Sequence, residues 1–248
     1  MAKIDQESVT TEMILNRLRG HLNEQKPVTL YNTYRGVPIT YEADVAMIHP
    51  NNTIGLIVHP YQAVCIKNER RTYIESRSLP ELIRAYPLTI DYTNHVVVLK
   101  QLEFPKSIST DLYHSWVAPA KAVKIEISSD EQGDFSGDLM ELSVLEENEI
   151  RIAMSVSDSL SLPRGDPLEL VFYLKGEHDL IQVQGTVLSL TKIRNQDQKR
   201  MEVAGTAAMG DEISILAYAA RREDEIMNSL AKAYRKLRKG KKFRKAKH

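Results

Sequence analysis

Short stretches in which apolar and polar residues alternate recur along most of this chain, and they constrain its fold more than any other feature. The clearest stretch is AVKIEI at residues 122–127, where three branched apolar residues alternate with Lys124 and Glu126. A period of two places alternate side chains on opposite faces of a β-strand, so that one face is buried and the other meets water. The chain is therefore expected to consist mainly of strands.

Turn residues divide this pattern into many short runs. In the first half, the runs VTLYNTY, VPITYEADVAMI, TIGLIVH, QAVCIK, RTYIES, LTIDYT and HVVVLKQLEF predict about seven strands, and LPELIRAY predicts a short helix. About six further runs follow from residue 122 onward, with the polar loop RNQDQ before the last of them. Short antiparallel strands remove their exposed sheet edges by closing into barrels. The expected fold class is therefore mainly β, with two small antiparallel β-barrel or split-barrel domains in tandem.

Helical periodicity is confined to the two ends of the chain. Ile14, Leu18 and Leu22 recur at a spacing of four, and Pro27 ends the pattern. After Asp211 no proline follows, and an apolar stripe with the spacing 4-3-4 predicts a long C-terminal α-helix. The stripe consists of Ile226, Leu230, Ala233 and Leu237. This helix is a candidate for oligomer formation, although four apolar positions are too few to predict a coiled coil.

The charges are distributed unevenly although they sum to zero. Residues 232–248 hold ten of the 33 Lys and Arg and none of the 33 Asp and Glu, so residues 1–231 carry 23 basic against 33 acidic side chains, a net charge of −10. A basic tail of this kind can dock onto an acidic partner, a nucleic acid or an anionic membrane surface. It can also be a solvated helix end, or fold back on the acidic body of the chain. The candidate partner-binding residues are Lys232, Arg235, Lys236, Arg238, Lys239, Lys241, Lys242 and Arg244.

Several function classes are disfavoured. Cys65 is the only cysteine, which excludes an intramolecular disulfide, and it lies in an apolar run where a buried thiol is expected. The seven histidines lack the spacing of metal ligands, so no metal site is expected. No catalytic motif or glycine-rich phosphate loop is present, and we expect no catalytic residues and no enzyme activity. No run approaches the roughly 20 apolar residues of a membrane span, so a cytoplasmic protein is expected.

Five motifs follow, in order, the strand pattern of a known barrel family: WVAPAKAVKIEI, GDLMELSVLEENEIRI, LPRGDPLELVFYL, VQGTVLSL and MEVAGTAAM. On these motifs, residues from about 106 to 220 resemble a PilZ domain. The N-terminal half, with QAVCIKNERRTYIESRSLPELIRAYPLTIDY, resembles the N-terminal domain of the two-domain flagellar-brake type of PilZ protein. The resemblance implies a split β-barrel at 1–105, a PilZ-like barrel at 106–211, and a C-terminal helix with a basic tail at 212–248.

PilZ domains typically bind cyclic di-GMP through an Arg-x-x-x-Arg motif and an Asp/Asn-x-Ser-x-x-Gly motif. Two guanidinium forks hold the phosphates and guanine edges of the ligand bidentately. In this sequence Leu112 and Trp116 occupy the two arginine slots, whereas Glu141, Ser143 and Glu146 occupy the slots of the second motif. Only the serine matches. Each lost charge-assisted contact is worth about 1.5–3 kcal/mol, so two lost contacts weaken binding by roughly two orders of magnitude or more.

The resemblance thus implies a degenerate cyclic di-GMP site, with Lys106, His114 and Lys121 as partial replacements for the arginines. Trp116 can be read either as an apolar plug of the barrel mouth or as a residue that stacks on a base or anchors a partner. The candidate ligand-binding residues are Lys106, Leu112, His114, Trp116, Glu141, Ser143 and Glu146.

We therefore expect a non-enzymatic bacterial signalling adaptor that acts through a protein partner of the motility, pilus or secretion machinery. Cyclic di-GMP is expected to bind weakly or not at all in the standard mode. The first alternative is a cyclic di-GMP receptor with an altered binding mode, and the second is a binder of nucleic acid or an anionic surface through the basic tail.

Overall fold

The computed structural model describes residues 6–108, 112–145, 149–174, 176 and 180–245, and within these ranges it describes side chains from 11 to 239. The residues form two compact units. The first comprises Met1–Tyr34, Pro38–Tyr113 and Met227–His248, and the second comprises Arg35–Val37 and His114–Ile226. Among the described helices, none combines the length and the apolar composition needed to cross a membrane.

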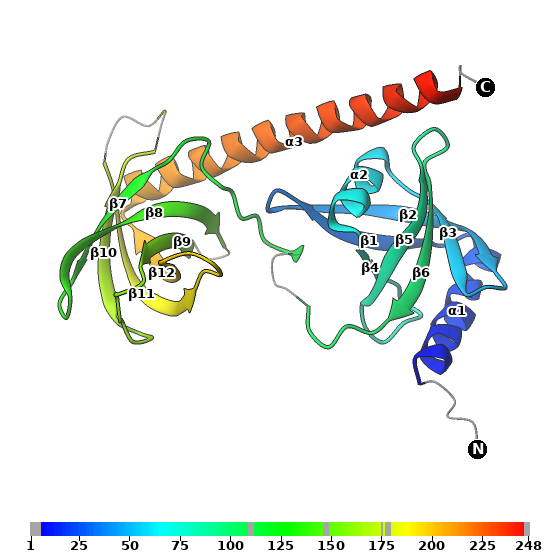
Figure 1. The fold of residues 1–248 in the computed structure, drawn as a ribbon, viewed down its shortest axis with the longest axis horizontal. Helices are drawn as coiled ribbons and strands as arrows, with labels where there is room; N and C mark the ends of the chain where they lie inside the picture. Colours follow the sequence, from blue (N-terminus) through cyan, green and yellow to red (C-terminus); the bar gives the residue numbers. More distant parts are fainter. Residues whose placement is uncertain (1–5, 109–111, 146–148, 175, 177–179, 246–248) are drawn as a thin grey trace. The chain divides into compact units, whose positions relative to one another are not determined.

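The first unit contains a closed antiparallel barrel with the strand order β1-β2-β3-β6-β5-β4 (Figure 1). Its strands are β1 (Pro27–Tyr34), β2 (Val37–His49), β3 (Thr53–Ile57), β4 (Thr72–Glu75), β5 (Ile83–Asp91) and β6 (Val96–Glu103). Pairing of β1 with β4 closes the barrel. Helix α1 (Gln6–Glu24) packs the buried face formed by Ile14, Leu15 and Leu18 against the barrel core. The spacing of these residues puts them on one side of the helix, as the sequence predicts.

Two local predictions in this barrel are wrong. The run QAVCIK, predicted as a strand, lies in helix α2 (Pro60–Glu69), in which five consecutive residues, Gln62–Ile66, are buried. A run buried on all sides has no periodicity that separates a helix from a strand. The run LPELIRAY, predicted as a helix, contains a loop followed by the start of β5, which pairs with β4 and β6. Cys65 is buried as predicted, and burial raises the pKa of its thiol well above the ordinary value.

The second unit contains another closed antiparallel barrel, with the order β10-β11-β12-β9-β8-β7. Its strands are β7 (Lys124–Ser129), β8 (Gly133–Val144), β9 (Ile150–Ser157), β10 (Pro167–Phe172), β11 (Ile181–Lys192) and β12 (Gln198–Ala207). In β7, Ile125 and Ile127 are buried whereas Lys124 and Glu126 are exposed. The predicted alternation is therefore present, and pairing of β7 with β10 closes the barrel. The expected mainly β fold with two small barrels in tandem is confirmed.

The C-terminal helix α3 (Met209–Lys245) begins close to the predicted residue. Ile226 and Leu230, predicted as part of an oligomerisation stripe, are 3% and 0% exposed. Leu237 packs against the core of the first barrel. Ile226 and Leu230 are thus covered within the chain, whereas Ala233 and Leu237 are half-buried, and oligomer formation through this stripe stays a prediction.

Candidate ligand site on the second barrel

The segment that leads into the second barrel, residues 116–120, is held at several points. The Trp116 N–H donates to the carbonyl of Gly36 at 2.8 Å, and Val117 exchanges two backbone hydrogen bonds with Leu142 of β8. The side chain of Arg222 in α3 donates to the Ala118 carbonyl at 3.1 Å. This segment is therefore an ordered part of the second unit and positions the Trp116 indole beside the barrel.

Three charged side chains meet on the outer face of β8, β9 and β12. Glu141 and Glu202 both pair with Ala153, from opposite sides, and this alanine is fully buried. Because alanine has so short a side chain, the two glutamates converge over it. Arg200, two residues before Glu202, lies on the same face of β12 as that glutamate.

Arg200 bridges the two carboxylates. Its Nη1 donates to Glu141 at 2.9 Å and its Nε donates to Glu202 at 2.9 Å. Its Cζ lies 6.0 Å from the centre of the Trp116 ring, at the outer limit of a cation–π contact. Burial of the guanidinium opposes its charge, but the hydrogen bonds to Glu202 and Glu141 prevail and raise the pKa of Arg200. We call these four residues, Trp116, Glu141, Arg200 and Glu202, the Arg200 cluster.

The Arg200 cluster carries one positive and two negative charges, a net charge of −1. Its guanidinium already has two carboxylate partners, and Glu202 also accepts a hydrogen bond from Ser189 at 3.3 Å. A dianionic ligand would meet the net negative charge of this cluster and would have to displace at least one carboxylate from Arg200. The cluster thus resembles an internally satisfied ion-pair network more closely than an open phosphate site.

The single matching residue of the second PilZ motif is not presented to solvent. Ser143 is 1% exposed, and within the described residues its hydroxyl has no hydrogen-bond partner. A ligand on the barrel surface could reach this hydroxyl only if the surrounding strands moved.

The other predicted ligand residues are distributed between the two units. Leu112 belongs to the first unit, where it is 4% exposed and packs in a small apolar cluster with Tyr73 and Leu82. Lys106 is exposed in the first unit, and His114 is half-buried in the second. Glu146 lies outside the described residues. Of the predicted residues described in the second unit, Trp116 and Glu141 meet in the Arg200 cluster.

Sequence reasoning missed Arg200 and Glu202, which complete the cluster. They lie about 60 residues after Glu141 in the chain, and only the register of β8, β9 and β12 brings them to it. Their spacing of two in the run KRMEVAG would have placed them on one face of a strand, but not beside Glu141.

The five basic tail residues whose side chains are described, from Lys232 to Lys239, are all exposed. The side chains of Lys241, Lys242 and Arg244 lie outside the described part of the chain. Across the described residues, no group of three or more His, Cys, Asp or Glu is arranged to hold a metal ion.

No protein-family model matches this sequence, and no curated protein matches it. Solved structures do resemble it. The inhibitor of motility MotI/DgrA of Bacillus subtilis is 15% identical, with 80% of this chain and 96% of that chain covered and a TM-score of 0.40. YcgR from Escherichia coli, solved in complex with c-di-GMP, is 11% identical, with 90% and 94% covered and a TM-score of 0.40. The K. pneumonia MrkH–c-di-GMP complex is 12% identical, with 91% and 96% covered and a TM-score of 0.35.

These are PilZ-domain proteins. The solved structures similar to this chain thus come from the family that its sequence resembles. At these identities and TM-scores, the likeness carries no argument about the ligand or partner of this chain, which must come from its own residues.

Proposed function

We propose that this chain is a PilZ-type signalling adaptor that acts through protein–protein contact in the control of motility, pili or secretion, without standard cyclic di-GMP binding and without enzyme activity. The observation that carries the proposal is the engagement of Arg200 by Glu141 and Glu202 at 2.9 Å each. The guanidinium beside Trp116 is occupied, and the slots of the two clamp arginines hold Leu112 and Trp116.

The magnitude of the loss supports weak or absent binding. Two missing charge-assisted contacts remove about 3–6 kcal/mol, which corresponds to roughly a hundredfold to ten-thousandfold in affinity. A ligand that recruited Arg200 instead would have to break its two ion pairs. These pairs are partly exposed, with side-chain exposures of 28% for Arg200 and 35% and 36% for its partners, so their disruption adds only a modest cost.

Calorimetric titration of the full chain with cyclic di-GMP tests the proposal. We expect no saturable heat up to about 100 µM ligand, whereas a receptor with a micromolar Kd would give a complete isotherm. If a complete isotherm is observed, the variants His114→Ala and Lys106→Ala would be titrated. If either abolished the heat, the altered-mode receptor would replace the adaptor proposal.

The exposed basic face of α3 favours a second candidate function, the binding of nucleic acid or an anionic surface. The described basic side chains from Lys232 to Lys239 are exposed, and a run of this charge attracts polyanions by release of counterions. This function predicts affinity for duplex DNA that falls steeply between 50 and 200 mM salt and is lost when residues 232–248 are deleted. If no DNA is bound at 50 mM salt, nucleic-acid binding through the tail is excluded.

A further inference from the structure

The first unit contains a cavity of about 920 Å³ that the proposed function does not use. Its walls come from the last turns of α1, from β1 and β2, and from the loop after β4. The volume lies within the range of roughly 300–1,000 Å³ that is usual for small-molecule sites.

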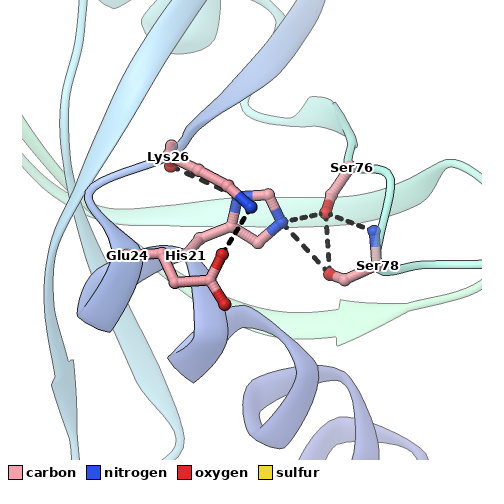
Figure 2. Close-up of polar contacts among 5 residues, drawn as sticks. All are labelled: His21, Glu24, Lys26, Ser76 and Ser78. Atoms are coloured by element: carbon pink, nitrogen blue, oxygen red, sulfur yellow. Dashed lines mark hydrogen bonds and ion pairs between the residues drawn. The ribbon is translucent and has the colours of Figure 1, made fainter.

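Polar side chains that line this cavity, His21, Ser76 and Ser78, contact one another (Figure 2). His21 and Ser76 are each 8% exposed, and the His21 Nε2 lies 2.5 Å from the Ser76 hydroxyl and 3.2 Å from the Ser78 hydroxyl. On the other side of the ring, Nδ1 lies 3.2 Å from the carbonyl oxygen of Lys26. The Ser78 N–H and the Ser78 hydroxyl also contact the Ser76 hydroxyl, at 3.1 Å and 2.8 Å.

The partners determine the direction of these hydrogen bonds. A carbonyl can only accept, so the His21 Nδ1 carries the proton, and in the neutral ring the Nε2 accepts from the Ser76 hydroxyl. The Ser76 oxygen then accepts from both the N–H and the hydroxyl of Ser78. The chain of donors runs from Ser78 through Ser76 and His21 to Lys26, and it leaves lone pairs of the Ser78 oxygen unused. Because bonds aligned in one direction polarise each other, the Ser78 oxygen is an acceptor at the end of the chain.

Charged groups of both signs also line this cavity. Within the described residues, the side chains of Arg77 and Glu42 make no ion pair or hydrogen bond, and both are exposed. The Arg17 Nη1 donates to the Ser78 carbonyl at 3.0 Å, which leaves the other N–H groups of this guanidinium for a ligand. Glu75 accepts a hydrogen bond from Tyr31.

Lys26 and Glu24, in contrast, are paired with each other at 2.5 Å (Figure 2). The hydrogen bond from Lys26, followed by its charge, lowers the pKa of the Glu24 carboxyl. Without this pair, the cavity presents two guanidinium groups and two carboxylates.

We propose that this cavity binds a small zwitterionic ligand, one that carries a carboxylate or phosphate together with an ammonium group. Arg77 and Arg17 supply the donors for the anionic group, because guanidinium groups match oxyanions bidentately. Glu42, Glu75 and the Ser78 oxygen are acceptors for the ammonium group. The negative end of the α1 dipole, at the last turn that holds His21, favours the same cation.

Isothermal titration of the full chain with matched probes tests this proposal. The zwitterionic probes are β-alanine, glycylglycine and O-phosphoethanolamine, and the single-charge probes are propionate, ethylammonium and inorganic phosphate. We expect at least one zwitterion to bind with a Kd below 1 mM, and at least tenfold more tightly than every single-charge probe.

Variants then test whether the zwitterion binds in this cavity. Arg77→Gln and Glu42→Gln change exposed side chains, so both are expected to fold with an unchanged Tm and to weaken the binding of the zwitterion at least fivefold. Arg194→Gln and Glu131→Gln, which change exposed side chains of the second unit, are the matched controls and should leave binding unchanged.

Three results would overturn the proposal. One is that no zwitterion binds with a Kd below 1 mM, in which case the contacts of His21, Ser76 and Ser78 only hold α1 to the loop after β4. The others are equal binding of the single-charge probes, and unchanged zwitterion affinity in both Arg77→Gln and Glu42→Gln.

Discussion

Replacement of Leu112 by arginine restores the residue type that PilZ domains typically have at this slot, and it separates a packing role from a ligand role. Leu112 is 4% exposed among Tyr73 and Leu82, with Tyr31 packed against the cluster. Burial of a leucine side chain is worth about 1.5–3 kcal/mol, and a cavity adds to the loss. The longer arginine can extend its guanidinium into solvent, which limits the added cost of its charge. We expect Leu112→Arg to destabilise the first unit by about 2–3 kcal/mol.

Hydrogen exchange measured by mass spectrometry reports the loss of stability in each unit separately. For amides of β4 and β5 that exchange by opening of the first unit, 2–3 kcal/mol corresponds to exchange that is about 30-fold to 150-fold faster. Leu88→Arg is the matched control, because Leu88 lies in β5 but is 49% exposed and should tolerate arginine. Unchanged protection in Leu112→Arg, or cyclic di-GMP binding gained by it, would refute the packing role.

Two further substitutions have defined outcomes. Gly36 has a φ of +84°, and a Cβ there would lie 1.9 Å from the carbonyl oxygen of Trp116, whereas Gly133 has a φ of +68° and open space around it. Gly36→Ala should therefore lower stability by at least about 1 kcal/mol more than Gly133→Ala and shift the Trp116 emission; equal losses would contradict the close contact. Burial, followed by the charge of His95, lowers the pKa of His59. At this residue the folded state therefore binds fewer protons than the unfolded state, and stability falls as the pH drops below about 6.5. Thermal unfolding from pH 8 to pH 5 should show a smaller loss in His59→Asn than in the wild type or in His49→Asn, and an identical loss in all three would count against this role.

The strands could be predicted from the sequence because each barrel has a buried and an exposed face. Ile125 and Ile127 face the core between exposed residues, and their period of two is visible in the sequence itself. Helix α2 could not be recognised from its periodicity, since the residues Gln62–Ile66 are all buried. The signals that mark it lie at its start: Pro60 is in its first turn, and the His59 ring accepts a hydrogen bond from the Tyr61 N–H.

The candidate site was predictable only in part, for a similar reason. Trp116 and Glu141 lie in motifs that resemble those of a family, and both belong to the Arg200 cluster. Arg200 and Glu202 depend on the pairing of β12 with β9 and of β9 with β8, and register between distant strands leaves no local trace in the sequence. The sequence shows which ligand residues are lost, but it does not show that two carboxylates bind the guanidinium of Arg200.

Titration of the Trp116 emission with cyclic di-GMP tests the central claim most directly. This is the only tryptophan of the chain, and its ring lies 6.0 Å from the Arg200 guanidinium, so a ligand that stacked there or displaced a carboxylate from Arg200 would change its fluorescence. We predict that the emission stays constant, after correction for absorbance by the nucleotide, up to about 100 µM cyclic di-GMP. A saturable change with a micromolar midpoint would contradict the account.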